Sequence, residues 1–65
     1  MFNLYFLTAV SSTELVFSNK DLGPCLDYIR AHRLYPQRCM IISPNNRRIT
    51  FNSSNELVFG EYKAA

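Results

Sequence analysis

The chain has 65 residues, of which 48% are hydrophobic and 18% charged, and its formal net charge is +2 at neutral pH. This length excludes a second domain, because short chains bury only a small fraction of their surface, and we expect residues 1–65 to form one small domain. The nine aromatic residues and the few Gly and Pro exclude a disordered chain. A core this small gains from self-association, so we expect a homodimer.

The N-terminal third predicts a hairpin. Residues 2–10 have apolar side chains on both sides of an extended chain, which is typical of a strand inside a sheet. The polar residues 11–13 predict a turn, and residues 14–18 (ELVFS) predict a second strand. If Val10 lies opposite Leu15, the hairpin has one coherent buried face. That face would contain Phe6, Val10, Leu15 and Phe17.

A helix is predicted to begin after Asp21, the candidate N-cap, and to end at about Arg33 or Leu34. Its apolar residues recur at spacings of three and four, which gives one stripe suited to packing on a sheet. Pro36 is expected to end the helix, because proline biases the preceding residue away from helical angles. The stripe consists of Leu22, Cys25, Leu26, Ile29 and the aliphatic stem of Arg33.

The remaining chain predicts three more strands. They cover residues 38–43 (RCMIIS), 47–52 (RRITFN) and 56–62 (ELVFGEY), and the Ser-Pro-Asn-Asn sequence at 43–46 predicts a turn between the first two. The element order is therefore ββαβββ. We expect an α+β fold with a mainly antiparallel, five-stranded sheet and one helix packed on one face.

One motif occurs twice. The sequence SSTELVF at residues 11–17 returns as SSNELVF at residues 53–59, and we interpret the pair as a repeated hairpin. The alternative is that Glu-Leu-Val-Phe after a Ser-rich turn is simply good strand sequence, so that the match arises by chance. A register that pairs Asn52 with Leu57 weakens the symmetry, because it turns Phe51 away from the phenylalanine of the second motif.

Basic residues gather in one part of the sequence, since the segment from Arg30 to Arg48 contains no acidic residue. Guanidinium groups interleaved with aromatic rings could bind phosphates and stack on bases, so nucleic-acid binding is the alternative function. Two structural roles would also account for these residues: basic side chains complement a helix C-terminus, and arginines protect an exposed sheet edge. The candidate contacts for nucleic acid or an acidic partner are Arg30, His32, Arg33, Tyr35, Arg38, Arg47 and Arg48.

Catalytic chemistry is not indicated. We expect Cys25 and Cys39 to be reduced core residues, because one lies on the apolar helix stripe and the other beside Met40 in an apolar strand. Together with His32 they are too few, in no standard spacing, for a closed zinc site. Two glycines cannot form a phosphate-binding loop. We therefore expect no enzyme activity, no metal and no cofactor.

Binding to another molecule through its surface is the remaining class of function for this chain. Tyr5, Phe51 and Tyr62 are candidates for an apolar and aromatic face that binds another protein. We expect a non-enzymatic interaction module that regulates or inhibits a larger partner, as phage and mobile-element accessory proteins do. The apolar opening segment has no preceding positive charge and is too short to span a bilayer, so we expect a cytoplasmic protein without a membrane partner.

Overall fold

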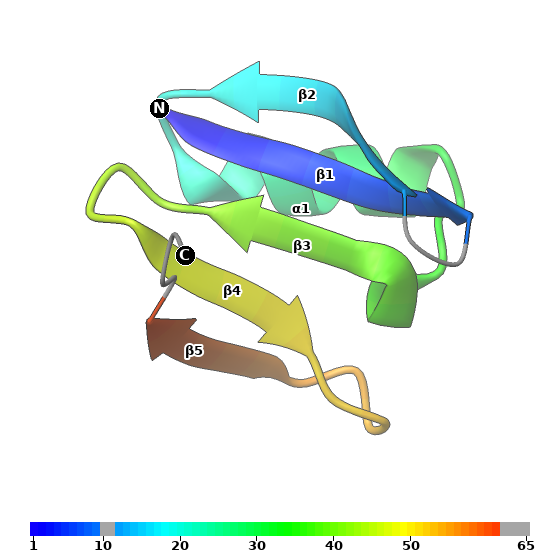
Figure 1. Cartoon of the computed structure of the whole chain (residues 1–65). Coiled ribbons are helices and arrows are strands. Elements are labelled where there is room, and N and C mark those ends of the chain that lie inside the picture. Colours follow the sequence, from blue (N-terminus) through cyan, green and yellow to red (C-terminus); the bar gives the residue numbers. More distant parts are fainter. Residues whose placement is uncertain (10–11, 62–65) are drawn as a thin grey trace.

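The computed structural model describes residues 1–9 and 12–61, and it confirms the α+β fold and the ββαβββ order. Its strands form one antiparallel sheet in the order β2-β1-β3-β4-β5, with one α-helix on one side (Figure 1). The elements are β1 (Phe2–Ala9), β2 (Ser12–Asn19), α1 (Leu22–Ala31), the short 3-10 helix η1 (Pro36–Arg38), β3 (Cys39–Ile42), β4 (Arg47–Phe51) and β5 (Leu57–Glu61).

The core lies between α1 and the sheet. Leu4, Ile41 and Ile49 lie directly opposite one another on β1, β3 and β4, and all three are buried. Cys25 and Ile29, one turn apart on α1, are buried against this row, as the predicted stripe requires. We call this side of the sheet the helix-side face and the other side the open face. In Figure 1, α1 lies behind β2 and β1, and no helix lies behind β4 and β5.

The first hairpin differs from the prediction. Ser12 belongs to β2 and not to a turn, while Val10 and Ser11 lie outside the described residues. Leu15 pairs with Tyr5, and the next pair along β2 joins Phe17 to Leu4. β2 therefore has a one-residue β-bulge at this point, which places Leu15 and Phe17 on opposite faces. The predicted face containing both residues is wrong because the bulge breaks the two-residue alternation.

The helix ends earlier than predicted, at Ala31. The N–H of Arg33 donates to the carbonyl of Arg30 at 3.2 Å, and the N–H of Leu34 donates to that of Ile29 at 3.0 Å. This pair of bonds is a Schellman motif, which satisfies the last carbonyls of a helix. Arg33 takes the left-handed position with φ 53° and is exposed, so it does not extend the apolar stripe.

The two C-terminal hairpins share one turn geometry. Asn46 (φ 59°) and Asn55 (φ 61°) each follow a turn closed by an N–H to carbonyl bond of 3.0 Å, from Asn46 to Ser43 and from Asn55 to Asn52. A three-residue loop of this kind needs a left-handed residue before the next strand, and Asn tolerates that conformation. The resulting register pairs Phe51 with Leu57. The predicted pairing of Asn52 with Leu57 is therefore wrong by one residue.

The repeated motif forms the two edge strands of the sheet and not two matching hairpins. Residues 14–17 lie in β2, and residues 57–59 lie in β5. The serines of the second motif lie in the turn between β4 and β5, whereas Ser12 of the first motif lies in β2. The same apolar segment is therefore used at both edges, with a different pairing register to the neighbouring strand.

Candidate functional site

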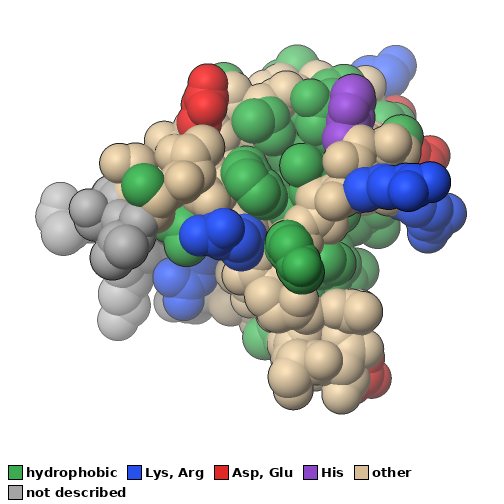
Figure 2. Space-filling view, turned by 90° about the vertical axis from the view of Figure 1, so that its right-hand side faces the viewer, with side chains coloured by type: hydrophobic (Ala, Val, Ile, Leu, Met, Phe, Trp, Pro, Cys, Tyr) green, Lys and Arg blue, Asp and Glu red, His purple; other side chains and the backbone are tan. Residues whose placement is uncertain are grey.

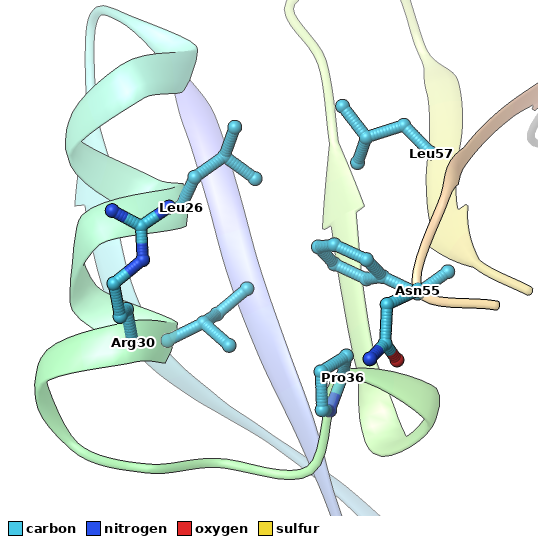
Figure 3. A pocket seen from close by; sticks show the side chains of 7 residues that line it. Leu26, Arg30, Pro36, Asn55 and Leu57 are labelled. Carbon is cyan, nitrogen blue, oxygen red and sulfur yellow. The ribbon is translucent and has the colours of Figure 1, made fainter.

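A groove separates α1 from the β4–β5 hairpin on the helix-side face. It has a volume of about 390 Å³ and is lined by Leu26, Ile29, Arg30, Pro36, Phe51, Asn55 and Leu57. Figure 3 shows Leu26 and Leu57 pointing toward one another across the opening, with Pro36 and Asn55 at one end. The groove exists because α1 packs mainly over β2 and β1, which leaves the apolar side chains of the last hairpin partly uncovered.

Gln37 of η1 fixes one end of the groove. Its side-chain N–H₂ donates to the carbonyl of Asn52 at 2.9 Å and to Oδ1 of Asn55 at 2.6 Å. The turn itself is held by Asn52, whose Oδ1 accepts the N–H groups of Ser54 and Glu56, each at 2.9 Å. These bonds join η1 to the β4–β5 turn, so the groove wall is a connected piece of structure.

The β5 edge is the second feature of this part of the molecule. Among the residues that the structure describes, β5 pairs with β4 alone. Phe59 is 56% exposed and Val58 is 44% exposed, and the two project to opposite faces. Asn52 and Glu56 form a hydrogen-bonded pair, because the N–H of Asn52 donates to the carbonyl of Glu56. Hydrogen-bonded and non-hydrogen-bonded pairs alternate along an antiparallel ladder. The N–H and C=O groups of Leu57 and Phe59 therefore point away from β4, toward the free edge.

The β2 edge is built differently. Besides the bulge between its Leu15 and Phe17 pairs, its pairing with β1 has a second irregularity, near Ala9. Glu14 is an exposed charge on this strand. Bulges and charges are devices that prevent edge-to-edge pairing. β5 has no proline and no bulge, and its one charged residue, Glu61, is its last, so the stretch from Leu57 to Gly60 is the least protected part of either edge.

The predicted aromatic contacts are not brought together. Tyr5 lies on the open face, where it pairs with Met40 and Leu15, whereas Phe51 lies in the groove on the helix-side face. Tyr62 lies outside the described residues. Their role in partner binding remains a prediction. Leu57 was not predicted as a site residue, although its place in the repeated motif was the available signal.

The predicted basic residues divide between the two ends of the sheet. One group lies at the C-terminal end of α1, in the connection that follows it and in η1. Its members are all exposed: Arg30, His32, Arg33, Tyr35 and Arg38. Arg47 and Arg48 follow the β3–β4 turn, and β3 runs away from η1 toward the opposite end. Figure 2 shows basic side chains separated by hydrophobic and other atoms on the face that it presents. Nucleic-acid binding remains a prediction, without one continuous surface of arginines to support it.

Both cysteines are free and buried, as predicted for core residues. The thiol of Cys25 lies 3.7 Å from the carbonyl oxygen of Asp21 and 3.8 Å from that of Phe2, and burial raises its pKa. The thiol of Cys39 lies 3.3 Å from the carbonyl oxygen of Tyr35, and burial raises its pKa to about 11. Because the thiolate is the nucleophile, these environments do not activate either residue.

Tyr28 connects two aromatic side chains on the other flank of α1. Its ring stacks on Phe17 of β2 with a centroid distance of 4.8 Å, and the ring of His32 lies 4.0 Å from it. His32 therefore contacts this stack. Within residues 1–9 and 12–61, no group of three or more His, Cys, Asp or Glu side chains could hold a metal ion.

No helix in the described part of the chain has the length and apolar character needed to cross a membrane. Comparison with known proteins gives no match to a family model, to a curated protein or to a solved structure.

Proposed function

We propose that this chain is a non-enzymatic protein-interaction module that binds by adding a strand to the free edge of β5. The observation that carries the proposal is the exposed edge at Phe59, in a strand without a bulge, whereas the edge strand on the opposite side of the sheet, β2, has a bulge. In strand addition, the main chain supplies the hydrogen bonds and alternate side chains supply specificity. The outward N–H and C=O groups of Leu57 and Phe59 provide those bonds.

A second copy of the chain fits this edge. If two β5 strands pair antiparallel about a twofold axis at Phe59, each Phe59 exchanges two backbone hydrogen bonds with its counterpart. The two phenylalanine rings then lie opposite each other on the helix-side face, and Val58 lies opposite Gly60 of the other copy on the open face. Gly60 has space on this side, because an added Cβ there would have only the Arg48 carbonyl, at 3.8 Å, within contact distance.

The same chemistry suits a strand of a larger protein. A module that occupies such an edge blocks what the larger protein would otherwise bind there, which is how it would act as a regulator or inhibitor. The exposed side chains of Val58 and Phe59, on opposite faces of β5, favour a partner strand with apolar residues opposite them.

Sedimentation equilibrium over a hundredfold range of protein concentration tests the proposal. We expect a reversible monomer–dimer equilibrium, because the self-complementary edge needs no other partner. Phe59→Glu should shift the dissociation constant at least tenfold toward the monomer, because it places two carboxylates opposite each other. Leu15→Glu is the matched control, since Leu15 is 53% exposed on the other edge strand, and it should leave the equilibrium unchanged. A dimer that persists in Phe59→Glu, or a monomer at every concentration, would overturn this interface.

A further inference from the structure

The helix-side face has room for a second helix. A helix with its side chains is about 10 Å wide and strands lie about 4.8 Å apart, so one helix covers about two strands. A five-stranded sheet therefore accommodates about two helices on one face. In this chain α1 packs mainly over β2 and β1, and the groove begins where its cover ends. In Figure 1, α1 does not extend behind β4 and β5.

The walls of the groove suit the apolar stripe of a helix. Leu26 and Ile29 contribute one wall from α1, and Phe51 and Leu57 contribute the other from the last hairpin. Phe51 and Leu57 lie directly opposite each other and are only partly buried. Side chains at spacings of three and four on a helix are the anchors that such grooves accept. The opposing leucines in Figure 3 leave space for an anchor between them.

The charge around the groove selects the chemistry of that helix. Among the described residues that line the groove, Arg30 is the only charged one. The nearest carboxylate along the hairpin, that of Glu56, accepts a bond from Nδ2 of Asn52 at 3.4 Å and does not line the groove. Acidic side chains on the flanks of a helix would therefore complement this site.

We propose that the groove binds an amphipathic helix of a partner protein, with an apolar stripe and acidic flanks. This goes beyond the strand addition proposed above, because it uses a different surface and a different element of the partner. The partner helix completes the helix layer beside α1, with its stripe on Phe51 and Leu57 and its acidic flank at Arg30.

A nuclear magnetic resonance titration with two designed peptides tests this proposal. Both peptides are helices of about 16 residues, or ~24 Å, with a leucine stripe; one has Glu on its flanks and the other has Lys. We expect the Glu peptide to bind at least tenfold more tightly and to shift the resonances of Leu26, Phe51 and Leu57. Arg30→Glu should reverse the preference, whereas Arg48→Glu, the same charge change on the open face, should not.

The outcomes separate this proposal from the first one. Val58→Glu, which places a carboxylate on the β5 edge but on the open face, should leave binding of the Glu peptide unchanged, because Val58 projects away from the groove. Failure of both peptides to bind, equal binding of both, or shifts confined to the open face would each overturn the proposal. Binding of decanoate to the groove residues without binding of either peptide would identify a site for a small apolar carboxylate and would also overturn it.

Discussion

Ile49 and Phe59 lie directly opposite each other in the ladder between β4 and β5, yet Ile49 is 2% exposed and Phe59 is 56% exposed. The cover that α1 provides therefore ends between two neighbouring strands. One residue of the pair completes the core, and the other presents an aromatic ring at an open edge. The groove is a consequence of this boundary, and it lies next to the free edge that β5 has as the last strand of the sheet.

Alanine substitution at these two positions should give very different results. Ile49→Ala should lower the free energy of unfolding by about 2–5 kcal/mol, because it leaves a cavity in the core. Phe59→Ala should lower that of the monomer by less than about 1 kcal/mol, because the ring is largely in water. Urea denaturation at a protein concentration that keeps the chain monomeric measures both values. Equal losses would show that Phe59 belongs to the core.

The left-handed residue after α1 offers a stabilising substitution. Arg33→Gly should raise the free energy of unfolding by about 0.5–1 kcal/mol, because Gly adopts φ 53° without the steric cost that Arg bears. Arg30→Gly, within the helix, is the control and should lower it by about 1 kcal/mol. Thermal denaturation of the two variants should therefore shift in opposite directions. A loss of stability in Arg33→Gly would contradict the Schellman geometry.

The bonds from Gln37 to the β4–β5 turn can be measured by a double-mutant cycle. Gln37→Ala should cost about 1 kcal/mol, because it removes both hydrogen bonds of the amide. Asn55→Gly removes the partner side chain and keeps the left-handed backbone conformation. We expect a coupling energy of about 0.5 kcal/mol or more between the two substitutions. Strictly additive losses would mean that the contact does not hold the groove wall.

The buried thiol of Cys39 makes both its labelling rate and the stability of the fold depend on pH. Burial raises the pKa of Cys39 from 9.0 to about 11, so at pH 8 its thiolate is about 100-fold scarcer than in the unfolded chain. Iodoacetamide should therefore label Cys39 far more slowly in native buffer than in urea. The thiol binds its proton more tightly in the folded state, so its contribution to stability is full below about pH 9 and is lost as pH rises toward about 11.

Cys39→Ala is the control for that pH dependence. The variant should lose less stability between pH 9 and 11 than the parent chain, because it has no thiol to ionise at this position. Rapid labelling of Cys39 in the folded protein, or identical pH profiles for the two chains, would contradict its burial as a neutral thiol.

The elements could be predicted from local patterns, but several registers could not. The apolar spacing of Cys25 and Ile29 predicts the helix and the face that it buries, because that periodicity is a property of one segment. Nothing in the ELVFS segment marks Val16 as the extra residue of a bulge, since a bulge is decided by pairing with β1. The early end of the helix at Ala31 also has no local signal, because Arg33 takes the left-handed position after it that Gly usually occupies.

The groove depends on information that no single segment contains. Its residues come from α1, η1 and the last hairpin, and they meet only because the helix packs toward β2. The register of the β4–β5 hairpin could have been predicted more closely from Asn55. A three-residue hairpin loop needs a residue in the left-handed conformation before the second strand, and Asn adopts that conformation readily. The separation of Arg30 from Arg47 followed from the direction of β3, which the sequence left open.

Amide hydrogen exchange of β5 at low and high protein concentration tests the strand-addition account most directly. The N–H groups of Leu57 and Phe59 should exchange quickly in the dilute monomer and become protected as concentration rises, while those of Val58 and Gly60 should be protected throughout by β4. Protection that appears instead in β2, or rates for Leu57 and Phe59 that do not change with concentration, would contradict it.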